Sequence, residues 1–203
     1  MKPFIIVSLI VFFSCSSFVS AQSHPDYYPL KISSEWKLSG YGTTPTITDK
    51  ILGIEKINNI QYARIERTNG EQEVIFYARC EENRVYKLEP PQKEELIFDF
   101  NTEINQSWIT SINYDDGTKG KRTGRIIGKD MTVKVPAGVF DGCIVYDITD
   151  TRKTEDGIQA VSYTYWLAPE IGVVKISVNV YHNSLAPGDM WVNDLSSYYI
   201  PVE

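Results

Sequence analysis

Closely spaced turn signals divide the first half of the chain into short segments rich in β-branched and aromatic residues. Three breaks lie within residues 47–88, at Asn58-Asn59, Asn69-Gly70 and Glu82-Asn83. Asn and Gly accept the positive φ angles that tight hairpin turns need. The pattern predicts a four-stranded antiparallel meander over Thr46–Ile57, Ile60–Thr68, Glu73–Cys80 and Arg84–Leu88.

The rest of the chain continues in the same way and offers no amphipathic helix with caps at both ends. In the segments 74–80 and 161–167 one strand face is apolar and the other is mixed, whereas a sheet that is wet on one side alternates cleanly. We therefore expect an all-β fold built on a single curved antiparallel sheet, a meander that approaches a half-barrel, with a two-sheet β-sandwich as the alternative. Further strands are predicted at Leu96–Phe100, Trp108–Tyr114, Arg125–Ile127, Met131–Val135, Cys143–Thr149, Ala160–Leu167 and Val173–Val180, and a last strand or irregular tail at Trp191–Ile200.

The N-terminus has the form of a secretory signal. Lys2 precedes the apolar run Phe4–Phe13, which is too short for a bilayer span of about 20 residues. Val19-Ser20-Ala21 predicts cleavage after residue 21, and Phe12-Phe13-Ser14-Cys15 offers the alternative of a lipoprotein signal with lipidation at Cys15. Both alternatives predict export to the periplasm, to the outer membrane or out of the cell. Residues 22–203 are then one β domain with a short flexible leader at 22–29.

The charge of this domain argues against two classes of partner. Residues 22–203 carry 26 acidic residues against 19 basic ones, since only Lys2 of the 20 basic residues lies in the signal. An acidic chain without a basic stripe is not expected to bind nucleic acid or anionic membranes. No later apolar segment reaches transmembrane length.

Catalytic motifs are not evident. His24 and His182 are the two histidines of the chain, and neither HExxH, CxxC nor GxSxG occurs. We therefore expect no metal, no cofactor and no enzymatic activity. Cys80 and Cys143 are a disulfide candidate in an oxidising compartment, and two separate buried thiols are an equally good interpretation.

The segment Gly117–Arg125 combines four basic residues with three glycines. It departs from a phosphate-binding loop because Gly120-Lys121 is followed by Arg122 rather than Ser or Thr. We expect a mobile hairpin tip whose charges keep a sheet edge soluble, with contact to an anion or a phospholipid headgroup as the alternative.

The large aromatic residues suggest a binding surface. Core packing is the simpler interpretation of any single tryptophan. As a set, large aromatics on the concave side of a curved sheet form a suitable wall for an apolar ligand. The candidate wall residues are Trp36, Trp108, Tyr165 and Trp166.

Three segments together resemble a group of exported bacterial proteins of unknown function. They are residues 27–30 (YYPL) with Trp36, the segment Val133–Phe140 (VKVPAGVF) followed by Cys143, and Tyr165–Lys175 (YWLAPEIGVVK). The chain departs from the group at Glu170, where glycine is common, and at Ser33-Ser34, where a glycine usually precedes the tryptophan. The resemblance implies a curved antiparallel sheet similar in shape to the outer-membrane lipoprotein carriers (the LolA/LolB-like group), and it implies no particular activity.

Two functions are therefore expected from the sequence. The first is an exported, non-catalytic β domain that binds a lipid or another apolar small molecule on an aromatic concave face. The second is a secreted or envelope-tethered structural module that contacts another envelope protein, for which the tyrosine-rich composition is suitable.

Overall fold

A computed structural model describes residues 26–42, 44–89, 93–114, 116–155, 157–182 and 186–202. The signal of residues 1–21, with Cys15, lies outside these ranges. All regular structure in the described ranges is β, and no helix there has the length and hydropathy to cross a bilayer. The strands are β1 (Glu35–Gly40), β2 (Ile47–Ile57), β3 (Ile60–Asn69), β4 (Gln72–Glu81), β5 (Arg84–Leu88), β6 (Glu95–Asp99), β7 (Ser107–Asn113), β8 (Lys119–Val135), β9 (Gly138–Thr154), β10 (Gly157–Ala168), β11 (Gly172–His182) and β12 (Ala186–Tyr199).

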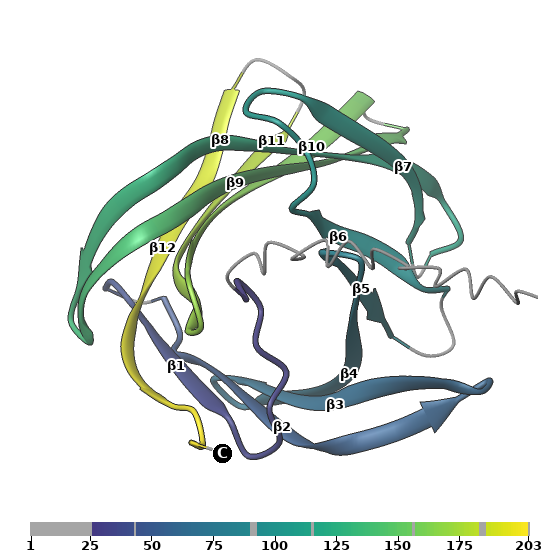
Figure 1. Cartoon of the computed structure of the whole chain (residues 1–203). Helices are drawn as coiled ribbons and strands as arrows, with labels where there is room; N and C mark the ends of the chain where they lie inside the picture. The colour runs from purple at the N-terminus through teal and green to yellow at the C-terminus, as the bar shows by residue number, and fades with distance from the viewer. Residues whose placement is uncertain are drawn as a thin grey trace, which may run out of the picture.

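The twelve strands form one antiparallel sheet that curves around almost to closure (Figure 1). Their order is β6-β5-β4-β3-β2-β1-β12-β11-β10-β9-β8-β7, so consecutive strands pair with each other everywhere except between β6 and β7. β1 pairs with β12, which joins the two halves, and β6 and β7 form the two outer edges. The prediction of a single curved antiparallel sheet is confirmed, and its curvature exceeds that of a half-barrel.

The meander agrees with its predicted turns. Asn58 and Asn59 have φ angles of 50° and 68°, Gly70 has 64°, and Glu82 and Asn83 have 49° and 61°. These left-handed angles are the reason why Asn and Gly occupy most of the turn positions. β2 to β5 begin and end within about one residue of the expected bounds.

The second half differs from the prediction in its strand lengths. The two short strands expected at Arg125–Ile127 and Met131–Val135 are parts of β8, whose pairing with β9 shifts register between Ile126 and Val133. Such β-bulges bend a strand without ending it, which is why the apolar pattern appears interrupted. The basic segment expected as a hairpin tip is mostly the first part of β8, which follows backbone hydrogen bonds that join Tyr114 to Gly117 and Thr118.

The first described residues run inside the curved sheet (Figure 1). Pro29 and Ser34 are fully buried, and the backbone of Ser34 hydrogen-bonds that of Ile51. Tyr28 packs against both hydrophobic clusters of the interior. Residues 26–29 therefore differ from the expected flexible leader, because they fill an interior that the sheet alone leaves open; residues 22–25 lie outside the described ranges.

Two hydrophobic clusters make up the core. The first surrounds Trp36, Ile65 and Phe76. The second surrounds Phe98, whose ring lies 5.1 Å from the ring of Tyr146, measured between centroids, in an edge-to-face arrangement. The buried residues of the second cluster come from β5, β6, β8, β9 and β10.

Side chains bridge the two edges of the sheet where the chain passes from β6 to β7. The Tyr146 hydroxyl on β9 accepts a hydrogen bond from the Asp99 amide on β6 at 3.0 Å and one from Trp108 Nε1 on β7. The Asn105 amide also donates to the Ile126 carbonyl on β8 at 2.8 Å. These contacts hold β6 near β7 and β8 without a continuous ladder of backbone hydrogen bonds.

Gly124 on β8 supports the Trp108 ring at this junction. A Cβ atom at position 124 would lie 2.3 Å from Trp108 Cζ2. We expect Gly124→Ala to lower the free energy of unfolding in urea by about 1–3 kcal/mol, because the partly buried ring must move. Gly53→Ala is the control, since a Cβ there meets nothing within 4 Å. Equal unfolding midpoints for the two variants would contradict this packing.

Candidate functional site

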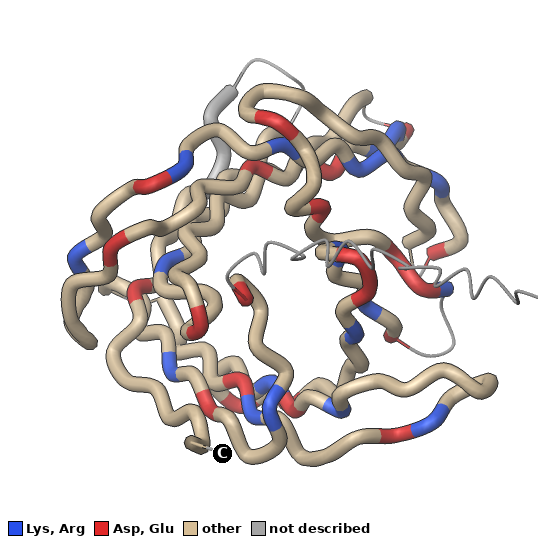
Figure 2. The backbone as a smooth tube through the Cα atoms, in the orientation of Figure 1, with Lys and Arg blue, Asp and Glu red and all other residues tan. Residues whose placement is uncertain are grey.

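A cavity of about 310 Å³ lies in the interior, and its wall is largely polar. Its lining includes Lys87 near the end of β5, Asn113 at the end of β7 and Asp150 in the last part of β9. Acidic and basic residues occur on strands on both sides of the interior (Figure 2). The wall consists of Tyr28, Tyr114, Tyr163 and Tyr165, of the charged residues Arg67, Lys87, Glu89, Lys93, Glu95, Arg122 and Asp150, of Asn113, and of Ala78, Val85, Ile97, Ile112 and Ile148.

Arg67 on β3 is held against the wall by Asp49 on β2. Its Nε and Nη2 atoms donate to the two carboxylate oxygens of Asp49 at 2.7 and 2.6 Å. The Arg67 side chain is 39% accessible and that of Asp49 is 16% accessible, so the cation faces the cavity and the anion faces the wall. The carboxylate raises the pKa of Arg67 and keeps the guanidinium charged, despite the opposing effect of burial.

Arg122 joins the two edges of the sheet inside the same cavity. Its Nε and Nη2 atoms donate to Asp150 on β9 at 2.7 and 2.6 Å, and its Nη1 atom donates to Glu95 on β6 at 3.0 Å. All three side chains are four-fifths buried or more. Two carboxylates thus share one guanidinium, which leaves a net negative charge on the group, and the contact to Glu95 ties β6 to β8 across the junction.

Lys87 on β5 is the third cation in the wall. Its Nζ atom contacts Glu89 and lies 4.8 Å from the centroid of the Phe76 ring. Burial lowers the pKa of Lys87, Glu89 opposes this effect, and the nearby guanidinium groups of Arg67 and Arg122 lower the pKa further.

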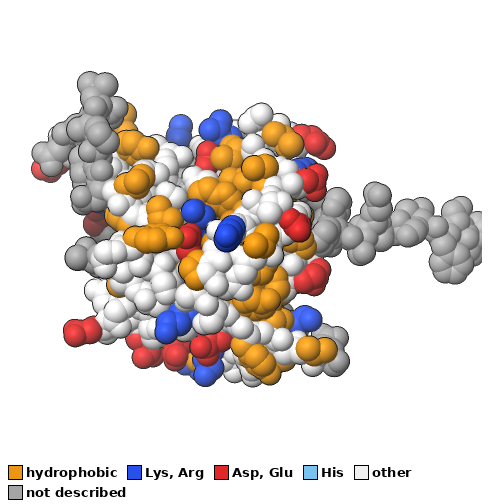
Figure 3. Space-filling view, turned by 90° about the vertical axis from the view of Figure 1, so that its left-hand side faces the viewer, with side chains coloured by type: hydrophobic (Ala, Val, Ile, Leu, Met, Phe, Trp, Pro, Cys, Tyr) orange, Lys and Arg blue, Asp and Glu red, His pale blue; other side chains and the backbone are white. Residues whose placement is uncertain are grey.

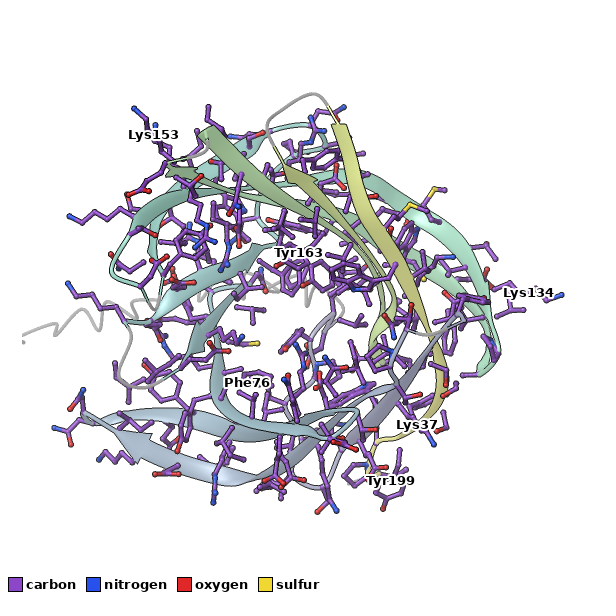
Figure 4. The ribbon with its side chains drawn as sticks, turned by 180° about the vertical axis from the view of Figure 1, so that it is seen from behind. Lys37, Phe76, Lys134, Lys153, Tyr163 and Tyr199 are labelled. Atoms are coloured by element: carbon purple, nitrogen blue, oxygen red, sulfur yellow. The ribbon has the colours of Figure 1, made fainter. Side chains whose placement is uncertain are left out.

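Tyrosine hydroxyl groups complete the polar wall. In the described ranges no hydrogen bond to another protein group is found for the hydroxyls of Tyr28, Tyr163 and Tyr165. Burial raises the pKa of each of the three, so that all remain protonated and able to donate at neutral pH. Tyr163 from β10 and Phe76 from β4 project into the interior from opposite walls, whereas Lys134 and Lys153 point outward (Figure 4).

The four predicted wall residues do not come together at this cavity. Only Tyr165 lines it. Trp36 is buried in the first cluster, where its Nε1 atom donates to the Ile171 carbonyl at 2.5 Å, and Trp108 packs on Gly124. Trp166 alternates with Tyr165 along β10 and so points to the other side of the sheet, with Lys175 Nζ 5.4 Å from its ring centroid.

Cys80 and Cys143 form no disulfide with each other. Cys80 on β4 and Cys143 on β9 are both free thiols. Burial raises the pKa of the Cys143 thiol to about 11, so the thiol is protonated and a poor nucleophile. Among the residues that the structure describes, no group of His, Cys, Asp and Glu side chains is arranged to hold a metal ion.

The three sequence motifs meet around residues 26–30. The Tyr27 hydroxyl donates to the Gly142 carbonyl at 3.1 Å, next to the second motif. Asp26 and Glu170 are joined by two hydrogen bonds, from the Glu170 amide to the Asp26 carbonyl at 2.7 Å and from the Asp26 amide to Glu170 Oε1 at 2.9 Å. Gly172 has a φ of 94° and lies beside Pro29 and Trp36. The motifs thus contribute to the folding of residues 26–30 against the sheet. Of their residues, Tyr28 and Tyr165 also line the polar cavity.

Sequence reasoning missed the charged residues of the cavity wall. Arg67 lies on the same strand face as the buried Ile65, and Arg122 on the same face as the buried Gly124 and Ile126. A charged residue in register with a buried apolar face is the signal that could have identified both.

The outer surface of the sheet carries exposed apolar side chains, in contrast to the polar wall of the cavity. On β8, β9 and β12 the side chains of Met131, Val139 and Tyr199 are 47%, 60% and 60% exposed. Apolar groups of this kind gather in several patches separated by charges on the corresponding face of the molecule (Figure 3).

Comparison with known proteins identifies the fold. No protein-family model matches the sequence, and no curated protein matches it. A crystal structure of a candidate lipoprotein from Parabacteroides distasonis has a TM-score of 0.57 at 14% sequence identity, over 88% of this chain and 100% of that one. A candidate exported protein with a YmcC-like fold from Bacteroides fragilis has a TM-score of 0.57 at 12% identity, over 87% of this chain and 100% of that one.

These similarities support one part of the resemblance that the sequence predicted. The descriptions of the two proteins agree with the expected likeness to exported proteins of unknown function. At 14% and 12% identity they establish the fold alone. The three-motif group and the shape shared with lipoprotein carriers stay predictions.

Proposed function

We propose that this chain is an exported, non-catalytic domain that binds a small polar molecule in its interior cavity. Export is supported by the features of residues 1–21 and by the descriptions of the two proteins with the same fold. The volume of about 310 Å³ is at the lower end of ordinary ligand sites and equals that of about ten water molecules in the liquid.

The observation that carries this proposal is the polar wall in an interior that is otherwise packed with apolar side chains. Burying charges is unfavourable unless they are paired, and a buried ion pair often contributes less stability than apolar residues of the same size. Arg67, Arg122 and their carboxylates are therefore not the simplest means of filling this space. Local departures from the packing that favours stability are typical of functional sites.

Binding without catalysis is supported by the state of the carboxylates. Both oxygens of Asp49 and both oxygens of Asp150 accept hydrogen bonds from one guanidinium each. A carboxylate that binds one guanidinium through both oxygens is suited to holding the arginine in place rather than to exchanging a proton with a bound molecule. The polar wall also makes the ligand more polar than the lipid or acyl chain expected from the tryptophans.

Mass spectrometry of the full-length protein, purified from the envelope of its own host, tests the proposal. The intact mass reports processing at residue 21 or at Cys15, and the denatured sample releases any bound molecule. We expect a small molecule in wild-type protein and its loss in Ala78→Phe, because the ring of the new side chain occupies part of the cavity.

Ala160→Phe is the matched control, since Ala160 points to the opposite side of β10 from Tyr163 and should leave the ligand in place. Wild-type protein that is folded and carries no bound molecule, or a molecule retained equally by Ala78→Phe, would contradict binding in the cavity.

A second function is favoured by the exposed apolar side chains of β8, β9 and β12. They suit contact with another envelope protein, since exposed apolar patches often mark interaction sites. Cross-linking in intact cells with a photoreactive residue at position 139 tests this alternative, and the absence of a cross-linked partner counts against it.

A further inference from the structure

The cavity wall presents hydrogen-bond donors that the carboxylates of the wall do not occupy. Asp49 engages Nε and Nη2 of Arg67, while no hydrogen bond from Nη1 is found within the described ranges. The hydroxyls of Tyr28, Tyr163 and Tyr165 are also available to donate. The acidic groups of the wall are engaged: Asp150 and Glu95 accept from Arg122, and Glu89 contacts Lys87.

Two of the cations converge on one aromatic ring. Arg67 Cζ lies 5.2 Å and Lys87 Nζ 4.8 Å from the centroid of the Phe76 ring. Both side chains line the cavity, and they are 39% and 30% accessible. Arg67 and Lys87 repel each other although Asp49 and Glu89 pair with them, and an anion bound to both cations would reduce this repulsion.

We propose that the molecule bound in the cavity is a small organic carboxylate, with its two oxygens at Arg67 and Lys87 and an apolar body against Val85, Ile97 and Ile148; this inference rests on the proposed function. One free guanidinium nitrogen and one ammonium group match two carboxylate oxygens. The apolar wall residues have no polar atoms to offer a second charged group.

The ionisation of Lys87 makes the binding depend on pH. Arg67 from β3 and Arg122 from β8 face Lys87, as do Glu89 beyond the end of β5 and Glu95, its register partner on β6. Lys87 loses its proton at a lower pH than an exposed lysine, because burial and the two guanidinium groups lower its pKa. The affinity for a carboxylate is therefore highest at neutral pH and falls as the pH rises through this lowered pKa.

Calorimetric titration of the ligand-free protein with 3-phenylpropionate, its neutral analogue 3-phenylpropanamide and inorganic phosphate tests the inference. We expect the carboxylate to bind, the amide to bind at least roughly tenfold more weakly, and phosphate to bind more weakly than the carboxylate, because hydrogen bonds to charged groups are the stronger ones. We expect Lys87→Met to weaken carboxylate binding roughly ten- to a hundredfold.

Lys87→Met should fold, since it removes an amine whose charged form burial disfavours, and its unfolding midpoint verifies this point. Lys134→Met, on the outer surface, is the matched control and should bind the carboxylate like the wild type (Figure 4). Equal binding of carboxylate and amide, or an unchanged affinity in Lys87→Met, overturns anion recognition and leaves cavity binding intact. Failure of the carboxylate to bind also overturns it, while the molecule found in the envelope-purified protein decides the proposed function separately.

Discussion

Replacing Arg122 by methionine is expected to lower the free energy of unfolding by about 3–5 kcal/mol, the range found when a buried charge loses its partner. Asp150 and Glu95 would both lose their only cation among the described residues, and their side chains are 8% and 20% accessible. The loss would also release β6 from β8, since Arg122 bridges the two edges of the sheet. Urea unfolding followed by tryptophan fluorescence measures the change.

Arg125→Met is the control for this prediction. Arg125 lies on the same strand, is 48% exposed and makes a single contact to Asp147 at 3.4 Å. Exposed pairs contribute little, so we expect a change within about 0.5 kcal/mol. The double variant Arg122→Met, Asp150→Leu should regain part of the loss, because it removes one unpaired carboxylate. A loss below about 1 kcal/mol in Arg122→Met would show that the network does not hold the junction.

Replacing Tyr28 by alanine is expected to cost about 3 kcal/mol of stability, as for other large-to-small changes of packed aromatics. The Tyr28 ring lies 5.8 Å from that of Phe98, between centroids, and packs against both hydrophobic clusters. The variant therefore tests whether residues 26–30 are part of the core or a dispensable leader. Thermal unfolding monitored by circular dichroism is the measurement.

Tyr199→Ala serves as the comparison, because Tyr199 is 60% exposed on β12. We expect its effect on stability to stay within about 0.5 kcal/mol. If the two variants unfold at the same temperature, residues 26–30 do not contribute to the core as described.

Local sequence signals were sufficient for the class of fold and for much of the strand pattern. The turns at Asn58-Asn59 and Asn69-Gly70 could be identified because positive φ angles restrict the residue types that a turn accepts. The strand β8 was harder, since its register shifts break the alternation that identifies a strand. The place of residues 26–29 could not be predicted, because nothing in a short polar and aromatic segment says which surface it packs against.

The candidate site also divides into residues that the sequence could suggest and an arrangement that it could not. The sequence predicted a common wall of Trp36, Trp108, Tyr165 and Trp166, and yet Trp36, Trp108 and Trp166 lie away from the polar cavity. The cavity consists of Tyr28 and of residues from every strand between β3 and β10, and Tyr28 and Tyr165 are 137 positions apart in the chain. Their proximity depends on how far the sheet curves, and no local pattern encodes that curvature.

The sequence by itself determined an antiparallel β fold and the positions of its tight turns, because alternation and turn chemistry act between neighbouring residues. Only the tertiary structure decided that Arg67, Lys87 and Arg122 face a common interior, and that residues 26–30 fill its other part. A strand pattern specifies which residues share a face of the sheet. The pairing of β1 with β12 and the contact of β6 with β8 close the sheet around an interior, and they decide which of these faces surround the cavity. Those contacts join distant parts of the chain, and they depend on packing that only the complete fold provides.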